Sequence, residues 1–505
     1  MGNTSRQTPS ADEESQFSVE HLATGLKERS ARGAAFTFGS QAFRLVLQLG
    51  SSAVLGRLLT PQDYGLIGMI SAVTGILSVF GNLGLSSAIV QQPEINHRQM
   101  SSLFWLNAAL GLALAAVTAA LAPGLAWFYH DPRLTEVTIV LGLGFFVSGL
   151  GVQHNALLRR KMRFGALSII EITAGVTGTV TAIWLASKDF GYWALALMPI
   201  ASAFTVTALS WLVCRWRPGI FFKKSGIRSM VIFGGNLTLF GTLNYFVRNF
   251  DNVLIGWRWG APELGQYARA YNLLLFPISQ INAPISNVIV PALSRLQDDP
   301  ARFRSYYLKG LNLVAYITMP LIVVMAVFSS EIIRVILGPQ WSQAGQLFRI
   351  LAVAAFLQPI ANTTGWLFTA LNRTAVMARW GLISGPLFVA SFAAGLPWRA
   401  PGVAIGYAAA SWLLTYPCFA MAVKGTPVSM RDVGQAIYRP FTAATILGLA
   451  MLAGHSFFAA YGTAWMLAFS GLACAAAISL MLLFSRSLRM DLGGIVNSMR
   501  ALRGA

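Results

Sequence analysis

Two apolar stretches of the chain each carry an arginine near the middle of a helical face that is otherwise polar. Around Arg44, polar side chains recur at helical spacing, at Gln41, Gln48 and Ser51. Around Arg248, the corresponding side chains are Asn244, Asp251 and Asn252. A charge at the centre of a bilayer costs about 2.5–3.5 kcal/mol, so it usually faces a cavity or a partner. Because a guanidinium offers a fork of donors that suits phosphate, these residues predict a cationic cavity for a phosphate-bearing ligand.

The same residues also fit a purely structural interpretation. Arg248 and Asp251 are three residues apart on a helix and would neutralise each other. Asn and Gln side chains in membrane helices commonly hydrogen-bond to a neighbouring helix. The sequence alone leaves both interpretations open. Arg349 and Glu171 lie near the ends of apolar stretches, and we interpret them as residues that extend toward the membrane interface.

A second group of residues consists of candidates for cavity lining or gating. Asn82 and Asn282 both lie in apolar stretches, 200 residues apart. Pro277 and Pro284 are seven residues apart in one stretch, and each proline removes a backbone hydrogen bond and kinks a helix. Small side chains precede Asn82 along one helical face, at Ser71, Gly75 and Ser78. We interpret this stripe as helix packing, with cavity lining as the alternative.

No pattern in the sequence indicates a catalytic or metal centre. The five histidines show no ligand spacing, and neither do the three cysteines, Cys214, Cys418 and Cys474. A Ser-His-Asp order and a nucleotide-binding loop are both absent from the sequence. We therefore expect a protein that is not an enzyme and has no cofactor or metal, with coupling to H⁺, Na⁺ or the membrane potential left open.

The composition indicates a membrane protein. Of the 505 residues, 55% are hydrophobic and only 11% are charged, whereas soluble domains carry about 25% charged residues. The net charge of +19 does not indicate nucleic-acid binding, because the basic residues lie in short loops between apolar stretches. We expect membrane lipids, and no nucleic acid, as partners of the surface.

Apolar stretches of about 20 residues, the length that crosses a bilayer, recur along the whole chain. We predict an all-α polytopic membrane protein with about fourteen transmembrane helices, at residues 33–56, 64–90, 101–122, 135–157, 167–186, 192–213, 231–256, 267–293, 311–330, 344–371, 381–397, 402–423, 440–457 and 463–484. With the N-terminus inside, the inner segments hold 27 of the 37 Lys and Arg residues and the outer loops hold 7. This asymmetry predicts that both termini are cytoplasmic.

An internal repeat relates residues 55–90 to residues 255–290 without a gap. Gly65 matches Gly265 and Asn82 matches Asn282, while Asp63 faces Glu263. Both copies follow an odd-numbered span, so the repeat predicts two six-helix pseudo-symmetric lobes plus two C-terminal helices. The predicted segments are a flexible cytoplasmic tail, an N-terminal lobe, a basic cytoplasmic linker, a C-terminal lobe, helices 13 and 14 and a cytoplasmic tail, at residues 1–32, 33–213, 214–230, 231–423, 424–484 and 485–505.

Three sequence segments carry a resemblance to a known family. They are "SSAVLGRLLTPQDYGLIGMISAVTGILSVFGNLGLSSAIVQQPEINHRQMSSLFWLNAALG", "RNFDNVLIGWRWGAPELGQYARAYNLLLFP" and "LLRRKMRF". They resemble Wzx-type polysaccharide flippases of the multidrug/oligosaccharidyl-lipid/polysaccharide exporter superfamily, in the branch of colanic acid, succinoglycan and teichuronic acid exporters. The likeness covers about the first ten spans.

The resemblance implies a flippase in the bacterial inner membrane. Its cargo would be an oligosaccharide repeat unit on undecaprenyl pyrophosphate, moved from the inner to the outer leaflet by alternating access for exopolysaccharide or O-antigen assembly. By their place in the helices, Arg44 and Arg248 would take the role of the family's cavity arginines, and polysaccharide polymerase or export machinery would be partners. The alternatives are a lipid II flippase or a drug exporter of the same superfamily. A membrane polymerase or ligase is disfavoured, because the predicted outer loops are short.

Overall fold

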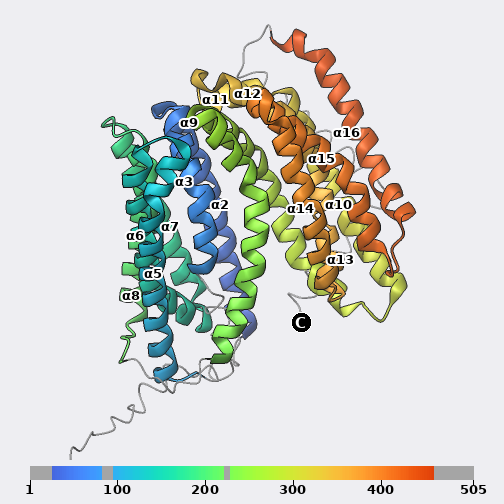
Figure 1. Cartoon of the computed structure of the whole chain (residues 1–505). Coiled ribbons are helices and arrows are strands. Elements are labelled where there is room, and N and C mark those ends of the chain that lie inside the picture. Colours follow the sequence, from blue (N-terminus) through green and yellow to red (C-terminus); the bar gives the residue numbers. More distant parts are fainter. Residues whose placement is uncertain (1–25, 82–94, 221–227, 460–505) are drawn as a thin grey trace, which may run out of the picture. The chain divides into compact units, whose positions relative to one another are not determined.

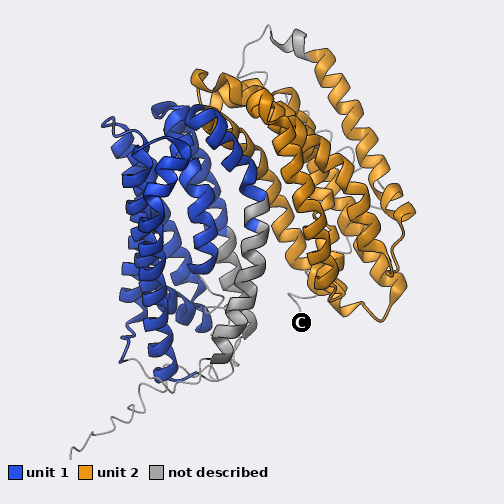
Figure 2. Ribbon diagram, in the orientation of Figure 1, with its two compact units in different colours: residues 1–262 blue, residues 263–505 orange. Residues whose placement is uncertain are grey.

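A computed structural model describes residues 26–81, 95–220 and 228–459 of the chain (Figure 1). Within these ranges all regular structure is helical, and no strand occurs. The chain divides into two compact units, residues 1–262 and residues 263–505 (Figure 2). The predicted segment boundaries, including the linker at 214–230, remain predictions.

Unit 1 is a helical bundle, and short turns join α2 to α3, α5 to α6, α6 to α7 and α7 to α8. It contains α2 (Leu26–Leu58), α3 (Pro61–Gly81), α5 (His97–Tyr129), α6 (Arg133–Arg160), α7 (Phe164–Ala186), α8 (Tyr192–Cys214) and the first part of α9 (Arg228–Arg295). Helix α5 begins with a capping box, in which the Asn96 side chain accepts from the Gln99 backbone N–H at 2.9 Å. The Gln99 side chain accepts from the Asn96 backbone N–H in return, so both N–H groups are satisfied.

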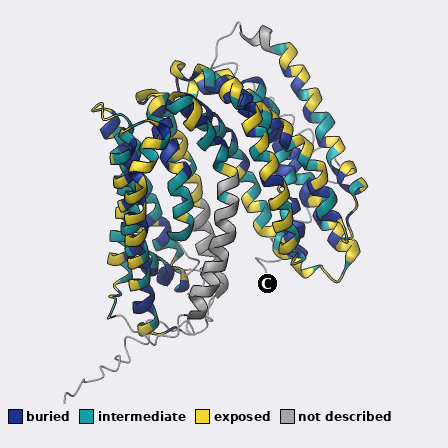
Figure 3. Ribbon diagram, viewed as in Figure 1, coloured by how far each residue is buried: buried dark blue, intermediate teal, exposed yellow. Residues whose placement is uncertain are grey.

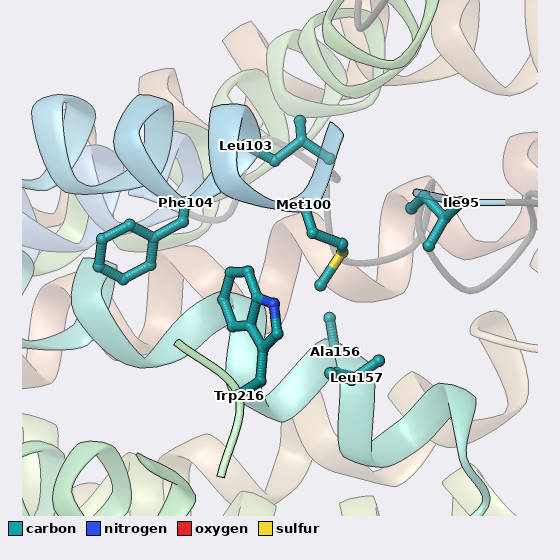
Figure 4. Packing of buried hydrophobic residues seen from close by; sticks show 7 residues of the cluster. All are labelled: Ile95, Met100, Leu103, Phe104, Ala156, Leu157 and Trp216. Atoms are coloured by element: carbon teal, nitrogen blue, oxygen red, sulfur yellow. The ribbon is translucent and has the colours of Figure 1, made fainter. Parts of the chain in front are cut away.

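Glycines allow α5 and α6 to pack with their backbones close together. A Cβ on Gly111 would lie 2.6 Å from the carbonyl oxygen of Phe145, and one on Gly149 would lie 2.7 Å from that of Asn107. At the start of α5, the buried side chains of Met100, Leu103, Phe104, Ala156, Leu157, Ile95 and Trp216 form one cluster (Figure 4). Trp216 belongs to the segment after α8, so this cluster attaches the beginning of the predicted linker to α5 and α6.

Unit 2 contains the remainder of α9, α10 (Pro300–Val327), α11 (Ser329–Ile336), α12 (Ser342–Ala361), α13 (Thr364–Ala370), α14 (Thr374–Gly395), α15 (Arg399–Val423) and α16 (Met430–Ala459). Two single 3₁₀ turns, η2 (Pro339–Trp341) and η3 (Leu396–Trp398), precede α12 and α15. Its core includes the fully buried side chains of Trp341, Tyr307, Phe303 and Phe348. An ion pair attaches α16 to α10: the Arg304 Nε donates to Asp432 Oδ2 at 2.8 Å, and a second guanidinium nitrogen contacts Oδ1.

The helix α9 is continuous except at Gly260, whose φ of 83° and ψ of −178° are not helical. A φ in this region is readily adopted by glycine alone. The two spans predicted at 231–256 and 267–293 both lie in α9, on either side of this break. The compact-unit boundary at Pro262 follows two residues later.

The described residues include ten helical stretches that are long and apolar enough to cross a membrane. Large apolar side chains are exposed on these helices, among them Trp127 at 79% and Leu413 at 75%, and exposed positions run along their lengths (Figure 3). Surfaces of this kind are stable where lipid, and not water, surrounds the helices. The chain is therefore a multi-pass helical membrane protein. The span predicted at 463–484 lies outside the described residues.

The structure places the two acids of the internal repeat in matching surroundings. Asp63 accepts from the Thr60 backbone N–H at 2.9 Å and lies against Gly191, the residue before α8. Glu263 accepts from the Ala400 backbone N–H at 3.2 Å, in the first turn of α15. Each acid thus lies beside the N-terminus of a helix in its own unit, where the helix dipole favours a negative charge.

Candidate functional site

A cluster of charged side chains in the described part of unit 1 lies where α2 packs on α7. The Arg44 Nη1 contacts Glu171 Oε2 at 2.8 Å, and the Arg44 Nη2 donates to the Gln41 side-chain oxygen at 2.9 Å. The other carboxylate oxygen of Glu171 lies 3.9 Å from a guanidinium nitrogen of Arg159, the penultimate residue of α6. The side chains of Arg44, Glu171 and Arg159 are named here the α2–α7 charge cluster.

The packing of α2 on α7 explains why this cluster forms. A Cβ on Gly175 would lie 3.1 Å from the Leu47 side chain, so the absence of a side chain at 175 lets α2 approach closely. One helical turn before these two residues, Arg44 and Glu171 occupy the same side of their helices. The register of the two helices therefore brings an acid and a base together that lie 127 positions apart in the chain.

The cluster is accessible and carries a net positive charge. The side chains of Arg44, Glu171 and Arg159 are exposed at 39%, 35% and 58%. Two guanidinium groups share one carboxylate, which leaves one positive charge in excess. Lys161, the residue after the end of α6, lies two positions beyond Arg159, and burial lowers the pKa of its ammonium group. An accessible site of this charge and donor geometry can bind an anion that competes with Glu171 for the guanidinium groups.

The second predicted group lies on α9, in the part that belongs to unit 1. Arg248 is exposed, whereas Asp251 is buried and accepts from the Asn252 backbone N–H at 2.8 Å. In the described part of the chain no ion pair joins Arg248 to Asp251, although their spacing permits one. The side-chain oxygen of Asn252 is buried without a hydrogen-bond partner, and the Asn244 side chain lies outside the described part. The structure thus assigns Arg248 no partner that neutralises it among the side chains it describes.

The remaining candidates differ in their surroundings. Gln41 and Gln48 are exposed on α2 beside Arg44. Pro277 is half-buried and Pro284 exposed, in a part of α9 that stays helical. The side-chain oxygen of Asn282 is buried without a hydrogen-bond partner, and Asn82 lies outside the described residues. The role of these residues as a cavity or gate stays a prediction.

The small-residue stripe of α3 packs against α9. The Tyr245 hydroxyl donates to the Ser71 carbonyl oxygen at 2.8 Å, and a Cβ on Gly75 would overlap the same tyrosine ring. A Cβ on Gly65 would overlap the backbone carbonyl of Ala261. These contacts support the packing interpretation for Ser71 and Gly75. They also explain Gly65 of the internal repeat, which lies inside α3 and permits the close approach of α9.

Sequence reasoning missed the roles of Glu171 and Arg159. Glu171 was interpreted as an interfacial residue, yet it is the ion-pair partner of Arg44. A signal was present in the sequence: Glu171 lies seven residues after the first residue of α7, inside a stretch that is otherwise apolar. An acid at this depth requires a partner, and the central arginine of another helix is the natural one to test.

Comparison with solved structures identifies a protein that shares this fold. The structure superposes on the lipid II flippase MurJ in an inward closed conformation with a TM-score of 0.71, covering 89% of this chain and 99% of that chain, at 13% sequence identity. At this identity the likeness establishes the fold alone. The chain thus shares the fold of this flippase, and the predicted all-α membrane class is confirmed, whereas the count of fourteen helices and the two-lobe arrangement stay predictions.

Residues 54–346 match the family described as polysaccharide biosynthesis protein. The chain is 25% identical to the lipopolysaccharide biosynthesis protein WzxC of Escherichia coli K12 over 426 residues, which is 82% of this chain and 85% of that protein. It is 27% identical to the teichuronic acid biosynthesis protein TuaB of Bacillus subtilis 168 over 441 residues, which is 83% of this chain and 87% of that protein. The chain belongs to this polysaccharide biosynthesis family, of the Wzx flippase type, and the resemblance found in the sequence is confirmed.

Proposed function

We propose that the protein moves an oligosaccharide repeat unit, linked to undecaprenyl pyrophosphate, from the inner to the outer leaflet of the bacterial inner membrane. The product would serve exopolysaccharide or O-antigen assembly. Membership of the polysaccharide biosynthesis family supports the class of cargo. The observation that carries the proposal is the accessible α2–α7 charge cluster, which offers two guanidinium groups to a phosphate-bearing head group inside a helical membrane protein.

The proposed mechanism is alternating access through a cationic central cavity to which Arg44 and Arg248 contribute. The undecaprenyl tail would stay in the bilayer while the pyrophosphate and sugar follow the polar path. Outward movement of an anion is favoured by an inside-negative potential, by about 2.3 kcal/mol per charge per 100 mV. Coupling to H⁺ or Na⁺ would add a further driving force. No catalytic step is proposed, and polymerase or export machinery would receive the product.

The proposed architecture has fourteen transmembrane helices, with both termini cytoplasmic. Two of the ten apolar helical stretches, Arg248–Arg295 and Thr374–Val423, have 48 and 50 residues, and about 20 residues suffice for one crossing. Each is interrupted, the first at Gly260 and the second by η3. These interruptions support two crossings in each stretch, and the repeat supports two six-helix lobes.

A lipid II flippase is the second candidate. The TM-score of 0.71 to MurJ supports this alternative, and the two cargoes share a polyprenyl pyrophosphate. The two functions separate by cargo preference in a reconstituted assay. A repeat-unit oligosaccharide on undecaprenyl pyrophosphate should be moved faster than lipid II by the proposed exporter, and more slowly by a lipid II flippase.

The test is transbilayer movement of an undecaprenyl-pyrophosphate oligosaccharide in proteoliposomes that carry a membrane potential and both ion gradients. Wild type should move the lipid, and Arg44→Ala and Arg248→Ala should each reduce the rate at least about tenfold, because a hydrogen bond to a charged group contributes about 1.5–3 kcal/mol. Arg431→Ala, the same substitution at an exposed arginine outside the predicted cavity, should move it at the wild-type rate. Normal rates in both cavity variants would refute the assignment of the arginines.

A further inference from the structure

Arg44 is occupied by residues of its own unit. One terminal nitrogen of its guanidinium contacts Glu171 at 2.8 Å, and the other donates to Gln41 at 2.9 Å. Both terminal nitrogens of the fork that would hold a phosphate are therefore already engaged. The pairing has a physical reason, because an unpaired charge within a bilayer costs several kcal/mol. A phosphate that binds both terminal nitrogens of Arg44 has to compete with the carboxylate of Glu171.

Glu171 has a second position available to it. Its other carboxylate oxygen lies 3.9 Å from Arg159, which is too long for a hydrogen bond but within ion-pair range. The Arg159 side chain is 58% exposed and can move toward the carboxylate. A small rotation of the Glu171 side chain would exchange the close contact with Arg44 for a close contact with Arg159. The carboxylate would remain paired in both positions.

A phosphate at Arg44 would drive this exchange. Glu171 and a pyrophosphate would be two like charges within a few ångströms of each other, and their repulsion is strong where water is scarce. The repulsion is relieved when Glu171 moves to Arg159. The reverse movement returns the carboxylate to Arg44 and weakens the hold on the phosphate. A binding site without such a competitor would bind the cargo more tightly and release it more slowly.

We propose that Glu171 is a built-in competitor for the phosphate site, which holds Arg44 when no cargo is bound, yields it to the cargo by moving to Arg159, and returns to promote release. The inference rests on the proposed function, since it concerns the same arginine and the same pyrophosphate-bearing cargo. Glu171 acts through Arg44, so it is a positioning residue. The proposal predicts that removing the charge of Glu171 strengthens binding of the cargo and slows its transport.

The experiment measures binding and transport separately. Binding of undecaprenyl pyrophosphate is titrated on the full-length protein in nanodiscs of neutral lipid, and transport of the oligosaccharide-bearing lipid is measured in proteoliposomes. Glu171→Gln, which keeps the shape of the side chain, should bind the probe up to about fivefold more tightly, the range expected for loss of a partly exposed ion-pair partner. Its transport rate should fall by a similar factor. Glu171→Asp, which restores the charge, should return both values toward wild type.

Two further variants keep the result specific. Glu136→Gln removes the same charge from an exposed glutamate in the first turn of α6 and should change neither value. The double variant Arg44→Ala, Glu171→Gln should bind no more tightly than Arg44→Ala alone, because the competition needs Arg44. Each variant is compared with wild type by its elution profile and its melting temperature, so loss of folding is distinguished from loss of binding.

The outcomes separate this inference from the proposed function. If wild type binds and moves the lipid but Glu171→Gln binds it equally or less tightly while folded, Glu171 is a structural ion-pair partner and the competitor proposal is wrong. If Glu171→Gln binds more tightly and also in the absence of Arg44, the effect is general electrostatics and the proposal is again wrong. If wild type neither binds nor moves the polyprenyl pyrophosphate, the proposed function fails, and the competitor proposal fails with it.

Discussion

Replacing Gly65 by alanine should separate α3 from α9. A Cβ at this position would overlap the carbonyl oxygen of Ala261 and lie 2.7 Å from its Cα. Two carbon atoms in contact sit about 3.5–4.0 Å apart, so the helices would have to move apart by about 1 Å or more. The overlapping atoms of Ala261 belong to the backbone, so they cannot rotate away as a side chain could. Overpacking of this kind costs about 3 kcal/mol at the upper end of its usual range.

The substitution also brings a gain, which must be subtracted. Alanine is favoured over glycine in a helix by about 1 kcal/mol, which leaves a net destabilisation of about 2 kcal/mol. Gly81, in the same helix, is the matched control: a Cβ there would lie 3.7 Å from Leu114, an ordinary contact. Gly81→Ala should therefore keep only the gain, and its stability should equal or exceed that of wild type.

The measurement is the apparent melting temperature of both purified variants in the same detergent, followed by fluorescence-detected size exclusion. Gly65→Ala should melt below wild type and Gly81→Ala at or above it. Equal melting temperatures for the two alanine variants would show that α3 and α9 do not touch at Ala261 in the folded protein. The reasoning from the close backbone approach would then be wrong, whatever the effect on transport.

Two further perturbations test other contacts. Asp432→Asn should lower the melting temperature by weakening the ion pair that attaches α16 to Arg304. The exposed Asp298→Asn is the control, and an unchanged melting temperature of Asp432→Asn would show that this ion pair does not stabilise the position of α16. Tyr245→Phe should cost about 1 kcal/mol by deleting the hydrogen bond to Ser71, and the same assay would contradict this contact if Tyr245→Phe and the exposed Tyr438→Phe melted alike.

Much of the fold could be predicted from the sequence because hydrophobic length is a local property. The range predicted at 192–213 corresponds to α8 (Tyr192–Cys214), and that at 402–423 to α15 (Arg399–Val423). Interruptions were harder to place. The short helix α11 (Ser329–Ile336) was not predicted. Its eight residues are too few to cross a membrane, and they are shorter than the window over which helical periodicity can be recognised. The single range predicted at 344–371 is two helices, α12 and α13, and α12 ends two residues after Pro359.

The candidate site could be predicted only in part. The polar stripe around Arg44 is visible in the sequence because helical periodicity is short-ranged. Its partner Glu171 could not be assigned, since the pairing depends on the register in which α2 packs on α7, and that register depends on Gly175 and Leu47. For Arg248 and Asp251 the sequence suggested a contact that the structure does not contain among the described side chains. Helical spacing permits their contact, yet the described side chains do not form it.

The break at Gly260 has a consequence for how the polypeptide could be divided. Residues 245–261 of α9 contact α3 at Ser71, Gly65 and Gly75, although they follow the predicted linker and precede the second compact unit. Dividing the gene between the codons for residues 220 and 228 would give two polypeptides. The second would begin with the part of α9 that packs against α3 of the first. The two fragments would hold one another by an exchanged helix, as subunits of a domain-swapped dimer do. Co-expression of such halves should therefore reconstitute the protein without a covalent connection, and a cut after Pro262 should not benefit from this exchange.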